Sequence, residues 1–331
     1  MGFRLLGVGS PLVDYSLAVS DGFLAEHVPG GKGASRPVST AEKDAVLRDA
    51  PHFVRTPGGS AANTMRIFGA LGGDGGFFAR IGADGDGEFF RAGLRDAHIR
   101  EVIIPPADDG RPNGCCVTLV TPDAERTMLF CRAESPVPSE ADVAAFDFGK
   151  FDHVHVEGYL LDEPWLGLLL KRAAAAGCRI SMDLNNFEMV SARREAFMRA
   201  ARESVDLLFA NQEEITALFD GAEMASIIDR LPGLVQTAVV KLGAAGSMIV
   251  TAGGVVRVPA LPDVTVKDTT GAGDYYAGGF FRGLSLGCDW ETCGRIGTLC
   301  AGEIIRVTGT VLDAAALEKL GKMTAKEAGR K

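Results

Sequence analysis

The chain has 331 residues, of which 47% are hydrophobic and 23% charged, and these ordinary globular proportions exclude a disordered or fibrous protein. Its net charge of −9 argues against general nucleic-acid binding, which needs a basic surface. A small anionic ligand remains compatible with this charge, because backbone amides at a helix N-terminus can bind phosphate. The 42 glycines predict many tight turns and close backbone approaches to ligands.

The seven cysteines are an odd number and include no C-x-x-C pair, which argues against a disulfide scaffold or a structural zinc site. The first residues contain only a short apolar run, interrupted by Gly and Arg, unlike a secretory signal. No apolar stretch approaches the roughly 20 residues of a membrane span. We therefore expect a cytoplasmic protein that has neither a membrane nor a nucleic acid as its partner.

The first half of the chain contains separated segments of strand length. Residues 3–8 predict a first strand, and residues 115–120 and 127–131 predict an antiparallel hairpin around a Thr-Pro-Asp turn. Between the first strand and this hairpin, residues 29–51 are polar and predict a segment that leaves the main sheet, with a short helix expected from Thr40. Together with a segment near 15–19, the hairpin predicts a small β-sheet lid, whose strands should lie within about 12–50 and 112–133.

From about residue 150 onward, apolar runs of strand length alternate with helix-period segments, which is typical of βαβ units and a parallel sheet. Polar or glycine clusters end each predicted strand, and in such sheets these ends form the ligand crevice. We expect an α/β fold in which residues 1–331 form a single domain. The predicted strands are 154–157, 179–183, 207–210 and 238–241, and the predicted helices include 164–176 and 192–203.

The sequence Asp-Thr-Thr-Gly-Ala-Gly-Asp at residues 268–274 precedes an apolar helical segment. A Gly-x-Gly at a helix start leaves the first amides unpaired, so they can form an anion hole. A carboxylate beside bound phosphate would repel it, so Asp274 is better suited to accept the proton of an attacking hydroxyl. The alternative is a glycine turn with an acidic residue in the first helical turn.

A second glycine motif, Gly58-Gly59, leads into a predicted helix that carries Asn63 one turn from its start. Two glycines allow a ligand to touch the backbone, and Asn63 would face back toward it. The alternative is a helix N-cap with a tight turn. Residues 30–33, Gly-Gly-Lys-Gly, are not a phosphate-binding Walker A loop, because Ser or Thr does not follow the lysine.

These two motifs, together with Asn211-Gln212-Glu213-Glu214 and Lys241-Leu242-Gly243, resemble the PfkB, or ribokinase-like, family of carbohydrate and nucleoside kinases. The resemblance covers nearly the whole chain, with the motifs in the same order. It implies a three-layer α/β/α fold with a mostly parallel central sheet and a small β-sheet lid. It also implies an ATP-dependent phosphotransferase with an alcohol group as acceptor.

The resemblance further implies a role for each matching residue. Asp274 would be the catalytic base, beside an anion hole of Gly271, Ala272 and Gly273. Glu214 would position Mg²⁺, usually through water, so ATP and Mg²⁺ are the expected cofactors, and a monovalent cation is a further candidate. Acceptor hydroxyls would be held by Asp14, Gly58, Gly59 and Asn63, and the nucleotide by Asn211, Lys241, Gly243, Thr269 and Thr270.

The acceptor is less defined. Residues 121–128 and 157–160 most resemble the bacterial adenosine-kinase-like branch of the family. A nucleoside needs an apolar or aromatic slot for its base, for which Tyr15, Leu17, Phe130 and Tyr159 are candidates. We expect adenosine, phosphorylated on its 5′-hydroxyl. A free sugar such as ribose or fructose and a non-catalytic nucleotide-binding or nucleoside-binding protein are the alternatives, and a monomer and a homodimer through the lid both stay open.

Other signals are weaker. His153 and His155 share a strand face but have no third ligand nearby, and residues 84–88 lack the full calcium-loop pattern, so we expect no metal at either place. For Asp183 and Asn185, a phosphate or metal-water role and a purely structural role stay open. Residues 65–66, Met and Arg, stand where the family often has small residues, which affects packing behind the acceptor site without removing a chemical group.

Overall fold

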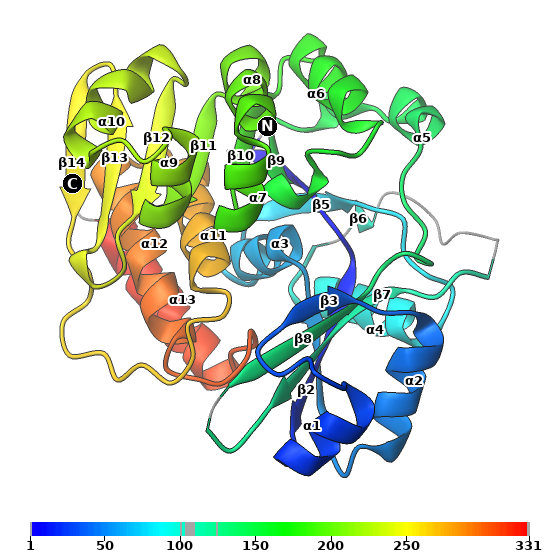
Figure 1. Cartoon of the computed structure of the whole chain (residues 1–331). Coiled ribbons are helices and arrows are strands. Elements are labelled where there is room, and N and C mark those ends of the chain that lie inside the picture. Colours follow the sequence, from blue (N-terminus) through cyan, green and yellow to red (C-terminus); the bar gives the residue numbers. More distant parts are fainter. Residues whose placement is uncertain (1, 100, 103–109, 124, 330–331) are drawn as a thin grey trace.

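The computed structural model describes residues 2–99, 101–102, 110–123 and 125–329, so Ala124 of the expected lid span lies outside the described residues. Its larger sheet has the strand order β14-β13-β12-β11-β10-β9-β1-β5-β6 (Figure 1). Neighbouring strands are parallel from β6 to β12, and β13 and β14 are antiparallel additions at one edge. The strands are β1 (Arg4–Val8), β5 (Asp74–Phe78), β6 (Glu101–Val102), β9 (His153–Glu157), β10 (Arg179–Asp183), β11 (Leu207–Asn211), β12 (Thr237–Lys241), β13 (Ser247–Thr251) and β14 (Gly254–Val258).

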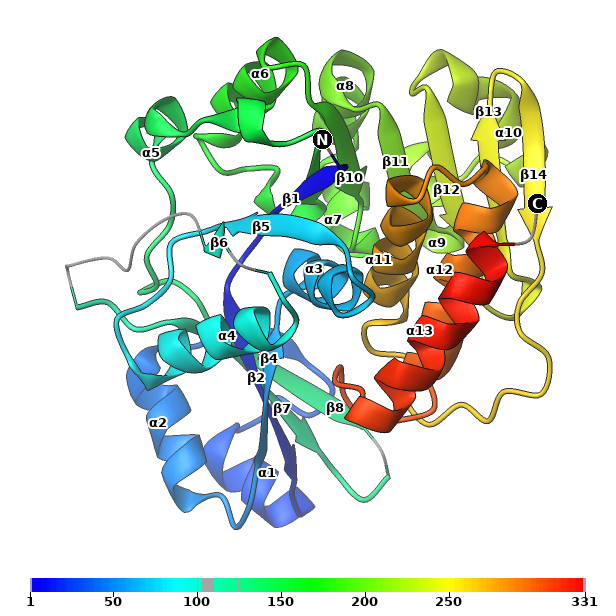
Figure 2. The same ribbon diagram turned by 180° about the vertical axis from the view of Figure 1, so that it is seen from behind.

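Helices cover both faces of the larger sheet (Figures 1 and 2), so its central strands are buried along almost their whole length. One layer contains α3 (Ser60–Ala70), α11 (Ala272–Ser285), α12 (Trp290–Ile304) and α13 (Ala314–Ala328). The other contains α5 (Glu140–Ala145), α6 (Leu166–Ala175), α7 (Phe187–Ala192), α8 (Arg194–Ser204), α9 (Gln212–Leu218) and α10 (Met224–Arg230). Short 3₁₀ turns are η1 (Phe148–Lys150), η2 (Gly158–Leu160), η3 (Leu231–Gly233) and η4 (Gly243–Ala245). The predicted three-layer fold with a mostly parallel sheet is confirmed.

Two adjacent glycines let α11 pack closely between its neighbours. A Cβ on Gly278 would lie 2.3 Å from Ile67 Cγ2 on α3, and one on Gly279 would lie 2.5 Å from Cys300 Sγ on α12. Larger side chains here would push the helices apart. The close approach holds the start of α11 against the start of α3, so the two glycine motifs meet although about 210 residues separate them.

A smaller five-stranded sheet has the order β3-β8-β7-β2-β4 and lies beside the larger one (Figures 1 and 2). It includes the predicted antiparallel hairpin of β7 and β8. Three helices pack against one of its faces: α1 (Asp21–His27), α2 (Thr40–Asp49), whose start at Thr40 was predicted, and α4 (Gly85–Asp96). Its strands are β2 (Leu12–Ala18), β3 (Ser35–Pro37), β4 (Val54–Gly58), β7 (Gly114–Val120) and β8 (Arg126–Cys131).

The two faces of β2 separate residues that were expected to share a site. Tyr15 and Leu17 point into the helix-covered face, where the Tyr15 hydroxyl donates to Asp86 Oδ1 (2.5 Å) and Leu17 is fully buried. Asp14 points to the opposite, open face, because side chains alternate along a strand. The expectation that Tyr15 and Leu17 line a base slot is therefore wrong. Phe130 and Tyr159 are exposed and stay candidates.

Candidate active site

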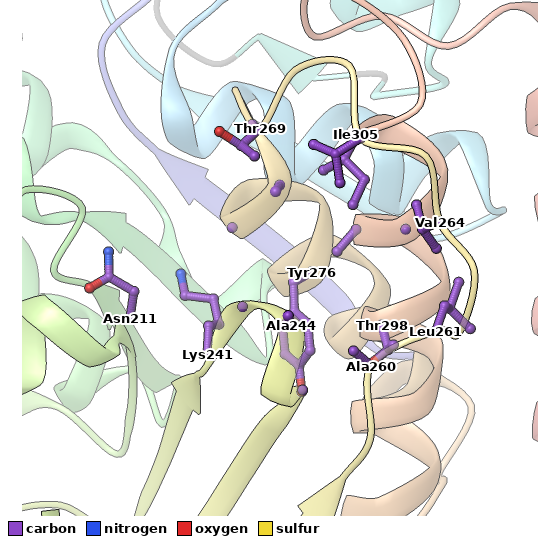
Figure 3. A pocket seen from close by; sticks show the side chains of 18 of the residues that line it. Asn211, Lys241, Ala244, Ala260, Leu261, Val264, Thr269, Tyr276, Thr298 and Ile305 are labelled. Carbon is purple, nitrogen blue, oxygen red and sulfur yellow. The ribbon is translucent and has the colours of Figure 1, made fainter.

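A cavity of about 730 Å³ lies where β10, β11 and β12 end and α11 begins. Asn211 and Lys241 stand at one end of it, and Leu261, Val264 and Ile305 at the other (Figure 3). The second end is apolar and can take a flat ring, whereas the first is charged. The predicted site residues that line the cavity are Asn211, Glu214, Lys241, Gly243, Thr269, Gly271, Ala272, Gly273 and Asp274.

Asp274 lies in the first turn of α11, and donors occupy both of its carboxylate oxygens. Ser60 Oγ donates to Oδ1 (2.7 Å) and Asn63 Nδ2 donates to Oδ2 (3.0 Å). Burial raises the pKa of Asp274 to about 7, although these two donors and the Lys241 charge oppose the shift. A carboxylate with a pKa near neutrality is suited to accept a proton from a hydroxyl.

The start of α11 is shaped by two glycines in tight surroundings. Gly271 has a φ of 76°, and a Cβ on Gly273 would lie 3.0 Å from Lys241 Nζ. The Ala272 amide donates to the Thr269 carbonyl (3.2 Å), whereas the Gly273 and Asp274 amides meet no backbone acceptor among the described residues. Free amides at a helix start, with a lysine ammonium beside them, form a site for an anion.

The two threonines before α11 behave differently. Thr269 lines the cavity, as expected of a nucleotide-binding residue. Thr270 does not line it; its amide and hydroxyl instead donate to Asp268 Oδ1 at 2.9 and 2.7 Å. Asp268 also accepts from the Gly309 amide (3.0 Å), so Thr270 takes part in holding the loop that precedes the glycines.

Lys241 lies among the carboxylates of Asp183, Glu214 and Asp274. Its Nζ donates to Asp183 Oδ2 at 2.7 Å, and Asp183 is only 2% exposed. Burial alone would lower the pKa of Lys241, but the Asp183 and Glu214 charges outweigh burial and raise it, so the ammonium stays protonated. Asp183, for which two roles were open, therefore pairs directly with the cation beside the anion site.

Glu214 is buried at the start of α9 in a reciprocal capping box with Asn211. The Glu214 amide donates to Asn211 Oδ1, while the Asn211 amide and its Nδ2 donate to the two Glu214 oxygens, each at 2.8 Å. Burial, together with the Asp183 charge, raises the pKa of Glu214 to about 7. The capping box holds the carboxylate at the wall of the cavity.

The predicted acceptor residues Asp14, Gly58, Gly59 and Asn63 lie outside the walls of this cavity. Asn63 touches Asp274 directly. A Cβ on Gly58 would lie 2.3 Å from Asp14 Oδ2, and one on Gly59 would lie 2.4 Å from the Ser10 carbonyl, so both positions need glycine. Asp14 is half-buried, and none of the described residues donates a hydrogen bond to its carboxylate. Its oxygens are thus available to a ligand that brings hydroxyl donors.

Sequence reasoning missed the link between Ser60 and Asn185. Asn185 Nδ2 donates to Ser60 Oγ (2.7 Å), and Ser60 in turn donates to Asp274. Asn185 also accepts from the Gly158 amide (2.7 Å), which fixes its side chain. Ser60 directly follows the paired glycines, so its place in that motif was the available signal. The structural role that was open for Asn185 is therefore to hold the Ser60 hydroxyl in place.

The weaker candidates have protein partners. His155 Nδ1 lies 2.9 Å from Ser181 Oγ, and burial lowers the pKa of His153 and of His155 to about 3. Asp84 caps α4 by accepting from the Gly87 amide. The described part of the chain contains no group of three or more His, Cys, Asp or Glu side chains that could hold a metal, and no helix there could cross a membrane.

Comparison with known proteins agrees with this geometry. The chain is 27% identical over 263 residues to aminoimidazole riboside kinase from Salmonella typhimurium, which covers 77% of this chain and 82% of that one. It is 29% identical over 267 residues to fructokinase from Vibrio alginolyticus, which covers 75% and 83%. It superposes on the crystal structure of adenosine kinase from Sinorhizobium meliloti with a TM-score of 0.85 and 28% identity, over 98% of this chain and 100% of that one.

The family follows from a longer match. Residues 34–316 match the family described as pfkB family carbohydrate kinase, and this range contains Gly58, Asn63, Glu214 and Asp274. The chain therefore belongs to the pfkB family of carbohydrate kinases, enzymes that transfer a phosphoryl group to a hydroxyl of a sugar or nucleoside.

Proposed function

We propose that this kinase transfers the γ-phosphoryl group of ATP to a hydroxymethyl oxygen of a ribonucleoside, with adenosine and its 5′-hydroxyl as first candidate. The choice of a nucleoside as acceptor rests on a row of side chains on the open face of the smaller sheet. Asp14 pairs with Cys116 across β2 and β7, and Cys116 pairs with Phe130 across β7 and β8. Two strand spacings, roughly 10 Å, therefore separate the Asp14 and Phe130 backbones.

This spacing suits a molecule with hydroxyls at one end and a flat ring at the other. One carboxylate can accept hydrogen bonds from two vicinal hydroxyls of a ribose. With the ribose on Asp14, the base would extend toward the Phe130 ring, which is 36% exposed. A free pentose or hexose is too short to use both ends. The names of two relatives, adenosine kinase and aminoimidazole riboside kinase, support the same choice.

The transfer step uses the groups around Asp274. The acceptor hydroxyl would give its proton to the Asp274 carboxylate while its oxygen forms the new bond to phosphorus. The bond from phosphorus to the β-phosphate oxygen breaks, and ADP leaves. The free amide of Gly273 and the Lys241 ammonium would stabilise negative charge on the transferring group. Such a reaction depends mainly on positioning and electrostatics.

The residues present fit a magnesium ion. Glu214 and Asp183 offer carboxylate oxygens, which Mg²⁺ prefers, and their mutual repulsion is one that a divalent cation would relieve. Glu214 would hold the ion, directly or through water, with phosphate oxygens completing its shell. Bound there, Mg²⁺ would neutralise charge on the phosphates. We also propose that the two sheets act as one kinase domain, in which the smaller sheet is the lid that excludes water.

A coupled ADP-release assay with Mg-ATP tests the proposal against adenosine, other nucleosides, ribose and fructose. Turnover confined to nucleosides, with adenosine best, is the expected result. Turnover on ribose or fructose instead would replace the nucleoside proposal by a sugar-kinase one and assign Asp14 to sugar hydroxyls. Nucleotide binding without turnover on any acceptor would favour a non-catalytic binding protein.

A further inference from the structure

Arg66 is a buried arginine that lies one helical turn after Asn63 on α3. Its side chain and backbone together are 7% exposed, and its guanidinium donates three hydrogen bonds. Nη1 donates to the Pro57 carbonyl (2.6 Å) and to Asn63 Oδ1 (3.1 Å), and Nη2 donates to the Thr310 carbonyl (3.2 Å). Arg66 forms no ion pair with a carboxylate in the described part of the chain. Its charge is therefore buried without a contacting counter-ion.

The contact with Asn63 determines how the Asn63 amide is oriented. A guanidinium can only donate, so the oxygen of the Asn63 amide must face Arg66. The nitrogen must then face the other way, and it donates to Asp274 Oδ2. In the reversed orientation the amide oxygen would meet the Asp274 carboxylate, and two acceptors would repel each other. Arg66 thus acts on Asp274 through Asn63.

Arg66 also lies near Asp14, because it donates to the Pro57 carbonyl and a Cβ on the next residue, Gly58, would lie 2.3 Å from Asp14 Oδ2. Burial raises the pKa of Asp14 to about 6, and Arg66 is the cation that opposes this shift. The thiol of Cys116 faces Asp14 from β7, and burial raises the pKa of that thiol to about 12, so it stays neutral. Around Asp274 the charged groups are Arg66, Lys241 and Asp183, so Arg66 is a minor influence there. Arg66 also faces the Tyr275 hydroxyl, whose pKa it lowers, and of the two carboxylates it acts more on Asp14 than on Asp274.

Building on the proposed function, we propose that Arg66 is a positioning residue of the acceptor site. Its guanidinium orients the Asn63 amide toward Asp274, and its charge keeps the Asp14 carboxylate ionised for the acceptor hydroxyls. The sequence pattern alone predicts only an effect of residue 66 on the packing behind the acceptor site. A purely structural Arg66 would tie β4 to the segment before α13 through Pro57 and Thr310, without influencing either carboxylate.

Three variants separate these two roles. Arg66→Met keeps the length of the side chain and removes its charge, and Arg66→Lys keeps the charge but loses the planar fork. Arg282→Met is the matched control, because Arg282 is a partly buried arginine on α11 that donates to the Gly72 carbonyl away from both carboxylates.

The first readout needs no acceptor and no turnover. Carbon-13 NMR of protein labelled at aspartate follows the titration of Asp14, whose signal is assigned by its loss in Asp14→Asn. Arg66→Met should move the Asp14 midpoint upward by about one pH unit or more, because a buried carboxylate loses its nearby cation. Arg66→Lys and Arg282→Met should leave the midpoint in place. An unchanged midpoint in Arg66→Met would overturn the proposal even if the enzyme proves to be an adenosine kinase.

The second readout uses adenosine, or ribose or fructose if the panel shows turnover there. Arg66→Met should lower kcat/KM for the acceptor by roughly 100-fold, and its acid limb should move to higher pH, while KM for ATP stays within about twofold. Arg66→Lys should keep the wild-type acid limb and acceptor KM but lose about tenfold in kcat, because the Asn63 amide is held less firmly. If Arg66→Met fails to fold, the lowered kcat and unchanged acid limb of Arg66→Lys still test whether Arg66 is a positioning residue. Equal changes in acceptor and ATP kinetics, with an unmoved acid limb, would show a structural role only.

Discussion

The charged side chains at the proposed nucleotide end of the site already have partners within the protein, whereas the proposed acceptor end keeps a carboxylate without a donor. Asp183 contacts Lys241, and Glu214 is held by Asn211 on both of its oxygens. Asp14, by contrast, is half-buried against Gly58 and has no donor among the described residues. The difference shows that the proposed nucleotide end is organised within the protein itself, while the proposed acceptor end leaves hydrogen-bond acceptors for a ligand to use.

The two ends also differ in how the chain builds them. The nucleotide end is formed by the ends of neighbouring parallel strands and by one helix start. Each functional side chain there is therefore positioned by the strand or helix that carries it. The acceptor end joins β2 and β4 of the smaller sheet to α3 of the larger layer. Changes among the paired charges of the nucleotide end should therefore affect stability as well as binding, whereas a change of Asp14 should act mainly on acceptor kinetics.

Asp274 stands where the two ends meet, so Asp274→Asn should give the largest effect. We expect kcat to fall by about 10³-fold, because general-base catalysis contributes on the order of 10² to 10⁴. ATP binding, measured by calorimetry, should change little. Asp313→Asn, which keeps a good N-cap at α13, is the matched control and should retain full activity. Full activity in Asp274→Asn would remove this residue from the mechanism.

Lys241→Met should show that the nucleotide end carries stability. Removing the cation leaves Asp183 buried and unpaired, which we expect to lower the free energy of unfolding by about 3 kcal/mol. Urea unfolding measures the loss. The double variant Asp183→Asn with Lys241→Met should regain part of it, since no charge is then stranded. Equal stability of the single variant and the wild type would mean that the pair contributes nothing.

Asp14→Asn should affect the acceptor end alone. We expect kcat/KM for the acceptor to fall by about 100-fold, since hydrogen bonds to a charged group contribute about 1.5–3 kcal/mol. KM for ATP should stay near wild type, because none of the described residues donates a hydrogen bond to this carboxylate. A comparable rise in KM for ATP would show that the two ends are not separable in this way.

The smallest expected effect is the opposite response of activity and stability to pH. Burial raises the pKa of Asp274 from 3.8 to about 7, so between these values the folded protein holds a proton that the unfolded chain releases. This group therefore lowers stability as the pH rises from about 4 to 7, whereas activity should rise through about pH 7 as the base ionises. Asp274→Asn should be more stable than wild type at pH 8, by about 1 kcal/mol or more, and equal to it near pH 4. Urea unfolding at several pH values checks this; a difference independent of pH would contradict it.

The order of strands and helices, the hairpin of β7 and β8 and the helix beginning at Thr40 were predictable because they depend on nearby residues. Alternation of apolar and helical segments marks βαβ units, and Ser39 and Glu42 form a capping box within four residues. The outward face of β2 was not recognised. Asp14 and Tyr15 are neighbours in sequence, and only the position of the covering helices decides which of them meets solvent.

Met65 shows why a departure from a family pattern is hard to interpret from the sequence alone. A Cβ on Gly7 would lie 2.3 Å from Met65 Cγ, and one on Gly75 would lie 2.7 Å from its Cε. The space for the larger side chain is thus provided by two glycines on the neighbouring strands β1 and β5. Nothing local to residue 65 reveals this compensation.

The amino-acid sequence by itself determined the glycine turns at residues 58–59 and 271–273, the place of Asp274 in the first turn of a helix and the parallel-sheet architecture, because each depends on local backbone preferences or on a contiguous motif. Only the tertiary structure decided that Ser60, Asn63 and Arg66 surround Asp274 as a connected network, with Asn185 behind Ser60. These hydrogen bonds join residues that are mostly more than 100 positions apart. Their partners are set by how α3 packs against α11 and by the hydrogen bond that the loop after β10 makes with Ser60, which no single segment of the chain specifies.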